Sequence, residues 1–177
     1  MRMKRIAYIL LFSLLLVSCG TRSGYFKMEG RFLHMNQGEL YVYSPDGGIA
    51  GLDTIKIEAG RFSYEKPCSK PSTLIIIFPN YSTQPIFAES GEAVEVKADA
   101  SHLKEMEVEG TEDNELMTKF RKQIASVSPP EELKYAIAFI KDHPESAVSV
   151  YLLNRYLVQT ESPDYKQAAK LLPLLIK

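Results

Sequence analysis

The chain has few of the residues that carry metal, redox or nucleophilic chemistry. Its 177 residues include two cysteines, three histidines and no tryptophan. His34, His102 and His143 lie far apart in the sequence, and none has a second ligand at a spacing such as HxxxH. The chain contains neither a GxSxG nucleophile elbow nor a GxxxxGK phosphate loop. We therefore expect no metal, no cofactor and no catalytic activity.

The balance of charge excludes a further class of function. The formal net charge is -1 at pH 7, and no stretch after the N-terminal segment is strongly basic. Nucleic-acid-binding domains carry basic patches, so we expect no nucleic-acid partner. Glu105, Glu107 and Glu109 alternate along the chain, which places them on the solvent face of a strand rather than in a pair of catalytic carboxylates.

The N-terminus has the pattern of an export signal. A basic start at residues 1–5 precedes an apolar run at 6–18, which is shorter than the roughly 20 residues of a spanning helix. Residues 16–19, Leu-Val-Ser-Cys, resemble the bacterial lipobox, in which the peptidase cuts before a cysteine that carries diacylglycerol. The sequence predicts a signal peptide at 1–18, cleavage between Ser18 and Cys19, a lipid on Cys19 and a flexible tether at 19–24. A plain signal peptide or an uncleaved anchor is the alternative.

An export signal and a lipidated cysteine imply a location in the cell envelope. The lipid would hold the protein to the outer or inner membrane, and the absence of an acidic cluster after Cys19 favours a periplasmic face. With Cys19 acylated, Cys68 would be a single free thiol. The flanking Lys66 and Lys70 could lower the pKa of this thiol, although a small residue in a surface loop is the simpler interpretation.

Residues 25–110 follow the two-residue period of β-strands. Apolar and polar residues alternate in short segments that are separated by turn signals such as Pro-Asp-Gly-Gly at 45–48. The pattern predicts an antiparallel sandwich or barrel of about eight strands. The strands are expected at 26–32, 40–42, 52–57, 61–65, 73–78, 86–88, 93–97 and 106–108.

The period becomes helical at residues 111–177. Ser128-Pro129-Pro130-Glu131 is a helix start with a capping residue, an initial proline and a Glu three positions after the cap. Asp-His-Pro at 142–144 ends that helix, because the residue before proline avoids helical angles. We expect three to four helices, the last with Ala168, Ala169 and Leu172 inward, and hence an α+β chain.

Two tyrosines are candidates for a binding surface. Tyr41 and Tyr43 alternate with Leu40 and Val42, so they share the face of their strand opposite the apolar one. Tyrosine also fits a half-buried strand surface without any binding role. We predict an exposed aromatic patch at Tyr41 and Tyr43.

Several segments, in order, resemble one family. It is the uncharacterised β-rich domain that precedes a thioredoxin-like domain of the AhpC/TSA type in many bacterial envelope lipoproteins. Each segment is weak alone, and their order carries the resemblance. The segments are the lipobox, FKMEGRF at 26–32, LDTI at 52–55, AGRFSY at 59–64, FAESGE at 87–92, GTEDN at 110–114, FIKDHPES at 139–146 and VYLL at 150–153.

The resemblance implies an association with thiol–disulfide redox systems, but it carries no redox residue to this chain. No WCxxC motif is present, and the sequence stops where the thioredoxin-like domain of the relatives would start. We predict a non-catalytic, lipid-anchored envelope protein that acts as an accessory or partner-binding domain. Two alternatives stay open: the N-terminal part of a truncated thioredoxin-like oxidoreductase, suggested by the apolar residues 171–177, and a glycan- or peptide-binding module that uses Tyr41 and Tyr43.

Replacing Cys19 by Ala tests the lipid anchor. Stable membrane attachment needs more than one acyl chain, and the lipidated cysteine would carry all of them. We expect the Cys19→Ala chain to move from the membrane to the soluble fraction, as measured by fractionation and immunoblotting. Persistence of the variant in the membrane fraction would contradict the lipid anchor.

Overall fold

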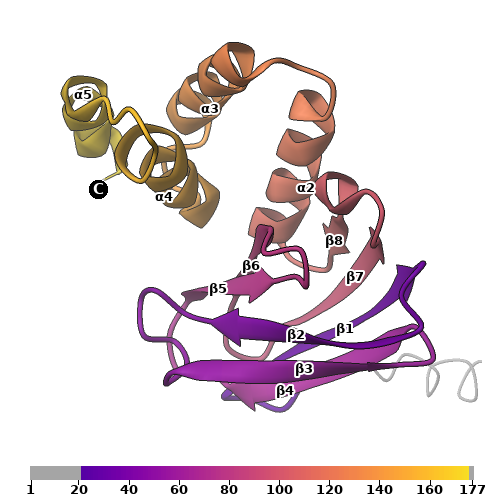
Figure 1. Cartoon of the computed structure of the whole chain (residues 1–177). Helices are drawn as coiled ribbons and strands as arrows, with labels where there is room; N and C mark the ends of the chain where they lie inside the picture. Colours follow the sequence, from indigo (N-terminus) through magenta and orange to yellow (C-terminus); the bar gives the residue numbers. More distant parts are fainter. Residues whose placement is uncertain (1–20, 176–177) are drawn as a thin grey trace, which may run out of the picture.

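The computed structural model describes residues 21–175 and shows a β-barrel followed by a helical layer (Figure 1). The expectation of an α+β chain with about eight strands and then three to four helices is confirmed. The strands are β1 (Tyr25–Leu33), β2 (Gln37–Tyr43), β3 (Leu52–Glu58), β4 (Arg61–Pro67), β5 (Ser72–Ile77), β6 (Thr83–Ala88), β7 (Ala93–Asp99) and β8 (Glu107–Glu109). The helical segments are the 3-10 turn η1 (Leu103–Glu105), α2 (Glu112–Ile124), α3 (Pro129–Asp142), α4 (Ala147–Leu153), the π-helical η2 (Asn154–Val158) and α5 (Tyr165–Leu175).

The sheet is mixed rather than wholly antiparallel. Its strand order is β6-β5-β2-β3-β4-β1-β7-β8, and it curls into a nearly closed barrel whose two edges are β6 and β8. We expected antiparallel pairing throughout, but β7 runs parallel to β1. A parallel pair requires a long connection, which strands β2 to β6 provide here. Side chains alternate with a period of two in both kinds of pair, so the sequence pattern did not separate them.

The barrel interior is filled by the alternating apolar residues of its strands. Gly30 faces inward on β1, where a Cβ would lie 2.4 Å from the carbonyl oxygen of Val96 and 2.8 Å from the ring of Phe62. Glycine therefore allows β1 and β7 to pack closely around the Phe62 ring. The largest fully buried side chains of this core are Phe26, Met28, Leu40, Ile55, Ile57, Ile76, Phe78, Ile86 and Met106.

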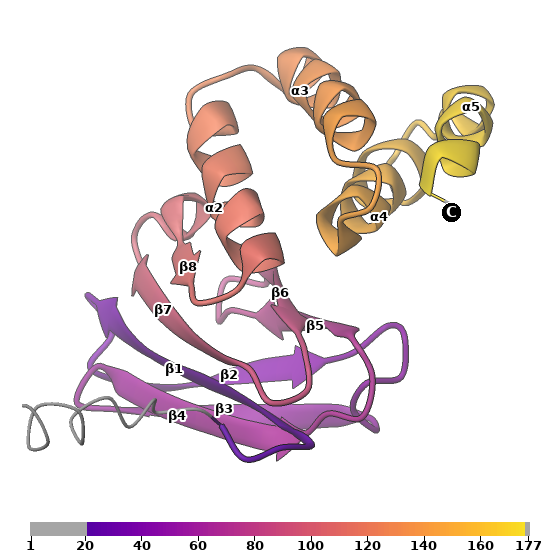
Figure 2. The same ribbon diagram turned by 180° about the vertical axis from the view of Figure 1, so that it is seen from behind.

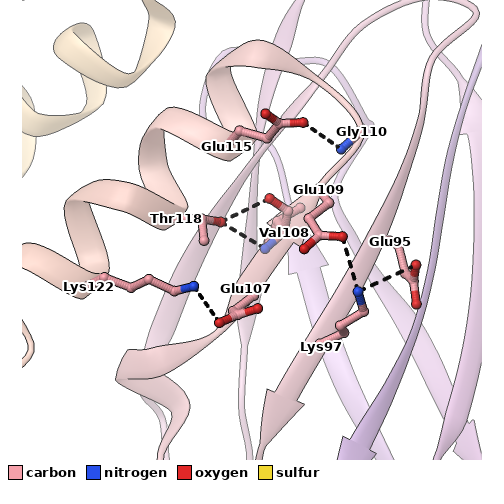
Figure 3. A network of polar contacts seen from close by, with 9 residues as sticks. All are labelled: Glu95, Lys97, Glu107, Val108, Glu109, Gly110, Glu115, Thr118 and Lys122. Atoms are coloured by element: carbon pink, nitrogen blue, oxygen red, sulfur yellow. Dashed lines mark hydrogen bonds and ion pairs between the residues drawn. The ribbon is translucent and has the colours of Figure 1, made fainter.

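Helix α2 covers the opening between the two edge strands. Figure 2 shows α2 rising from between β6 and β8. On the β6 side, the Asn114 amide accepts a hydrogen bond from the Phe87 N–H at 3.0 Å and donates one to the Phe87 carbonyl at 2.7 Å. On the β8 side, the Thr118 hydroxyl accepts from the Val108 N–H at 2.8 Å and donates to the Val108 carbonyl at 2.9 Å (Figure 3). Each side chain thus pairs with one edge residue as a further strand would.

Arg121 joins the two edges. Its guanidinium donates to the carbonyl of Pro85 in β6 at 2.9 Å and to that of Met106, just before β8, at 3.4 Å. Asn114, Thr118 and Arg121 lie four and then three residues apart, so they share one face of α2. Buried backbone groups without partners are costly, and these three side chains provide partners for backbone groups on both sides of the open seam.

The helices form a second hydrophobic core. The expected capping of α3 is confirmed, because Ser128 is its N-cap, Pro129 its first residue and Glu131 the partner in the capping box. In α5 the expectation is wrong for two of three residues: Ala168 is buried, but Ala169 is exposed and Leu172 is 47% exposed, and Leu171 is buried instead. Leucines surround the end of α5, so the sequence pattern did not single out its buried face. The buried residues of this core are Phe87, Met117, Phe120, Ala136, Phe139, Ile140, Val148, Leu152, Leu153, Leu157, Ala168 and Leu171.

Replacing Thr118 by Val tests the closure of the barrel. The substitution keeps the side-chain shape but leaves the N–H and carbonyl of Val108 without their partner. We expect a loss of about 2 kcal/mol in the free energy of unfolding, measured by urea denaturation. Thr54→Val on the exposed face of β3 is the matched control and should change stability by less than about 0.5 kcal/mol. Equal stability of the two variants would show that Thr118 does not hold the seam.

Candidate interaction surface

The lipobox lies outside the part of the chain that the structure describes. Ser18 and Cys19 therefore have no structural account here. Among residues 21–175, no helix is both long and apolar enough to cross a membrane.

Tyr41 and Tyr43 lie on the outer face of β2, as expected. They are 43% and 37% exposed, so both rings are accessible. Tyr43 stands opposite Leu52 of β3, which is 61% exposed, and Tyr41 stands opposite Ile77 of β5. Directly opposite residues in neighbouring strands have Cβ atoms about 5 Å apart. With Ile77 half-buried and the other three exposed, these four side chains form one surface across three strands, which we call the tyrosine patch.

The tyrosine patch has a polar border at one end and the helical layer at the other. Glu39 and Lys56 stand opposite each other in β2 and β3, two residues along from the Tyr41–Thr54 pair, and both are exposed. At the other end, Tyr43 lies near Tyr151 of the helix α4. Burial raises the pKa of Tyr151, and the interaction with Tyr43 adds to the rise. An apolar centre with a polar rim is typical of protein-binding surfaces.

Cys68 is a buried thiol. Its side chain is 6% exposed, and the Sγ–H donates to the carbonyl of Lys70 at 3.3 Å. Burial raises the pKa of Cys68, and the carboxylates of Glu89 and Asp46 raise it further. The flanking lysines therefore do not lower this pKa, because burial and the two acidic groups act in the opposite direction, and the side chain is buried rather than exposed as the surface-loop interpretation implied. A buried, protonated thiol is a poor nucleophile.

The sequence indicated scattered histidines, but the fold brings His34 and His102 to the same carboxylate, and His143 lies apart from them. His34 occupies a turn, where its Nδ1 is 2.8 Å from the Asp99 carboxylate, and His102 is 3.9 Å from the same group. Hydrogen bonds from His34 and Ser101 hold the pKa of Asp99 well below its usual range. His143 ends α3, and its ring packs on Phe139 at 4.7 Å between centroids. In the described residues, no three His, Cys, Asp or Glu side chains are grouped as metal ligands would be.

The alternating glutamates near β8 form ion pairs at the surface. Figure 3 shows Glu109 of β8 paired with Lys97 of β7 at 3.1 Å and Glu107 paired with Lys122 of α2 at 2.6 Å. These ion pairs link β8 to β7 and to α2.

The carboxylate of Asp53 has three partners in the β3–β4 hairpin. It accepts from Lys66 Nζ at 2.7 Å, from the Tyr64 hydroxyl at 3.1 Å and from the Thr54 N–H at 2.8 Å. The hydrogen bond from Lys66, followed by that from Thr54, lowers the pKa of Asp53. Burial of the ring, and then the same carboxylate, raise the pKa of Tyr64. The cluster fastens β3 to β4 at the end of the hairpin away from its turn.

Sequence reasoning missed the polar face of α2. Asn114, Thr118 and Arg121 are buried, with exposures of 1%, 8% and 3%. The sequence did contain an indication of this face. The three polar residues recur at helical spacing and lie next to the apolar Met117 and Phe120, so the buried side of the helix could not be apolar throughout.

Two comparisons bear on the family of the chain. The family model described as Domain of unknown function (DUF4369) matches residues 26–117, more than half of the chain. The match covers the barrel and the first part of α2, including Asn114. No curated protein matches the chain.

The Asp53 cluster predicts a pH-dependent stability. Because the pKa of Asp53 is lower in the folded state than its unfolded value of about 3.9, its stabilisation is complete above that value and is lost as the pH falls through the folded pKa. Asp53→Asn should cost about 1 kcal/mol at pH 7 and progressively less below about pH 4. Urea unfolding at several pH values measures this difference.

Glu58 is an exposed carboxylate on the same strand, and Glu58→Gln is the control. It should change the free energy of unfolding little at pH 7 or below about pH 4. A cost of Asp53→Asn that stays constant with pH would contradict the prediction.

Proposed function

The chain belongs to the DUF4369 family, and from that premise we propose that it is a non-catalytic accessory domain of the cell envelope that binds a protein partner. The observation that carries the proposal is the tyrosine patch. Its two phenol rings and Leu52 lie exposed on a rigid sheet. Tyrosine provides large contact area at low entropic cost and is enriched at binding hot spots.

The lipid on Cys19 supplies the location in this proposal. Several acyl chains would hold the protein at the membrane, and the tether at 19–24 would leave the barrel free to meet a partner close to the surface. The barrel starts at Tyr25, directly after that tether.

We propose a thioredoxin-like protein of the envelope as the partner. The support is the resemblance of the ordered segments to lipoproteins in which such a domain follows this one. In the alternative of a truncated oxidoreductase, the same surface would contact the attached thioredoxin-like domain.

The second candidate is a glycan- or peptide-binding module. The exposure of Tyr41 and Tyr43 favours it, because sugar rings and extended peptides both stack on accessible aromatic side chains. The border formed by Glu39 and Lys56 would then provide hydrogen bonds to the ligand.

Removing both rings tests the partner proposal. Thioredoxin-like domains from the envelope of the source cell are titrated against the full chain by calorimetry. We expect one of them to bind the unchanged chain, and the Tyr41→Ala/Tyr43→Ala chain to bind at least about tenfold more weakly. The melting temperature should stay within about 3 °C, because the rings are on the surface.

Tyr165→Ala is the matched control, since Tyr165 lies on α5 and is 65% exposed. It should leave the affinity unchanged. The proposal would be contradicted if the Tyr41→Ala/Tyr43→Ala chain bound as tightly as the unchanged chain, or if no thioredoxin-like domain bound at all. Binding of oligosaccharides that depends on Tyr41 and Tyr43 would favour the second candidate instead.

A further inference from the structure

A cavity of about 320 Å³ lies where α2, η2 and the start of β6 meet. Arg121 lines it from α2, Arg155 and Tyr156 line it from η2, Gln84 lines it from β6, and Lys104 lines it from η1. None of the four residues of the tyrosine patch lines this cavity. Its volume falls within the range of small-molecule sites.

Arg121 brings a buried positive charge without a carboxylate partner. It is 3% exposed, and its three acceptors are the Gln84 side-chain oxygen at 2.8 Å and the carbonyls of Pro85 and Met106, all neutral. Among residues 21–175, no carboxylate forms an ion pair with it. Burial lowers the pKa of Arg121 to about 10. A guanidinium has five N–H groups, and these three bonds leave two for a further acceptor.

The other charged groups of the cavity are mostly positive. Lys104 and Arg155 add two cations, and Glu132 is the carboxylate among the lining residues. Glu132 already accepts from the Tyr156 hydroxyl at 3.1 Å. Burial raises the pKa of Tyr151, and Arg155 and Arg121 oppose the rise, so both cations act on the same part of the cavity wall. The field inside the cavity therefore favours an anion.

Part of the wall has an unusual backbone. In η2 the N–H of Gln159 donates to the carbonyl of Asn154 at 2.7 Å, a bond that spans five residues. Such π-helical turns are rare, and they occur frequently at functional sites. Arg155 and Tyr156, the two residues that η2 contributes to the cavity, lie within this turn.

The cavity also has an apolar side. Met117, Phe120 and Leu152 are nearly fully buried, and the rings of Phe120 and Tyr156 meet edge to face at 6.3 Å. We propose that this cavity binds a small organic carboxylate with an aliphatic or aromatic body. The carboxylate would accept both remaining N–H groups of Arg121, and the body would lie against Phe120. A free acid and the C-terminal residue of a polypeptide share this chemistry.

The test compares an acid with its neutral analogue. The full chain, purified in detergent, is titrated with 3-phenylpropionate and with 3-phenylpropanamide, and the Arg121 Nε–Hε signal is followed by NMR. We expect saturable binding of the acid with a Kd below about 1 mM and at least about tenfold weaker binding of the amide. A tetrapeptide that ends in Phe, with a free or an amidated C-terminus, distinguishes the two sources of carboxylate.

Arg155→Gln is the informative variant, because Arg121→Lys would also remove bonds that close the barrel. Arg155→Gln should weaken binding of the acid about threefold or more at an unchanged melting temperature. Arg31→Gln, an exposed arginine on β1, is the matched control and should change nothing. Equal binding of acid and amide would overturn the proposal. So would the absence of binding at 10 mM acid, a concentration that corresponds to a binding free energy of about 3 kcal/mol. Tighter binding of inorganic phosphate than of the acid would also overturn it.

Discussion

The closure of the barrel by α2 is the interaction on which the rest of the structure depends. A sheet that curls without closing leaves two edges with unpaired backbone groups, and buried groups of that kind are costly. Asn114 and Thr118 each satisfy both backbone groups of one edge residue, and Arg121 bridges the two edges. The helix therefore takes the place of the strand that would complete the barrel.

This closure also positions the helical layer. Because Phe87 is tied to α2 by its backbone, its ring points into the second core, where it meets Tyr151 of α4 edge to face at 6.3 Å. The helices consequently pack against β6 through Phe87, while Tyr41 and Tyr43 of β2 and Leu52 of β3 stay exposed. The exposure of Tyr41 and Tyr43 is thus a consequence of where α2 is attached.

The same interaction explains why the cavity is positively charged. Arg121 is required at the seam for its hydrogen bonds to carbonyls, and carbonyls satisfy its N–H groups without neutralising its charge. Lys104 and Arg155 then surround the cavity from segments far apart in the sequence. The structural role of Arg121 and the proposed ligand site use different N–H groups of one side chain.

The sequence alone determined the elements: the two-residue period predicted the strands, the helical period the helices, and Ser128 with Glu131 the start of α3. It also placed Tyr41 and Tyr43 on an outer face. These features depend on neighbours a few residues away, so local pattern suffices.

Only the tertiary structure decided the parallel β1–β7 pair, the burial of Cys68, the bonds between Asn114 and Phe87 and the grouping around Arg121. Each of these depends on residues brought together from distant segments, and the periodicity of one segment carries no information about its partner.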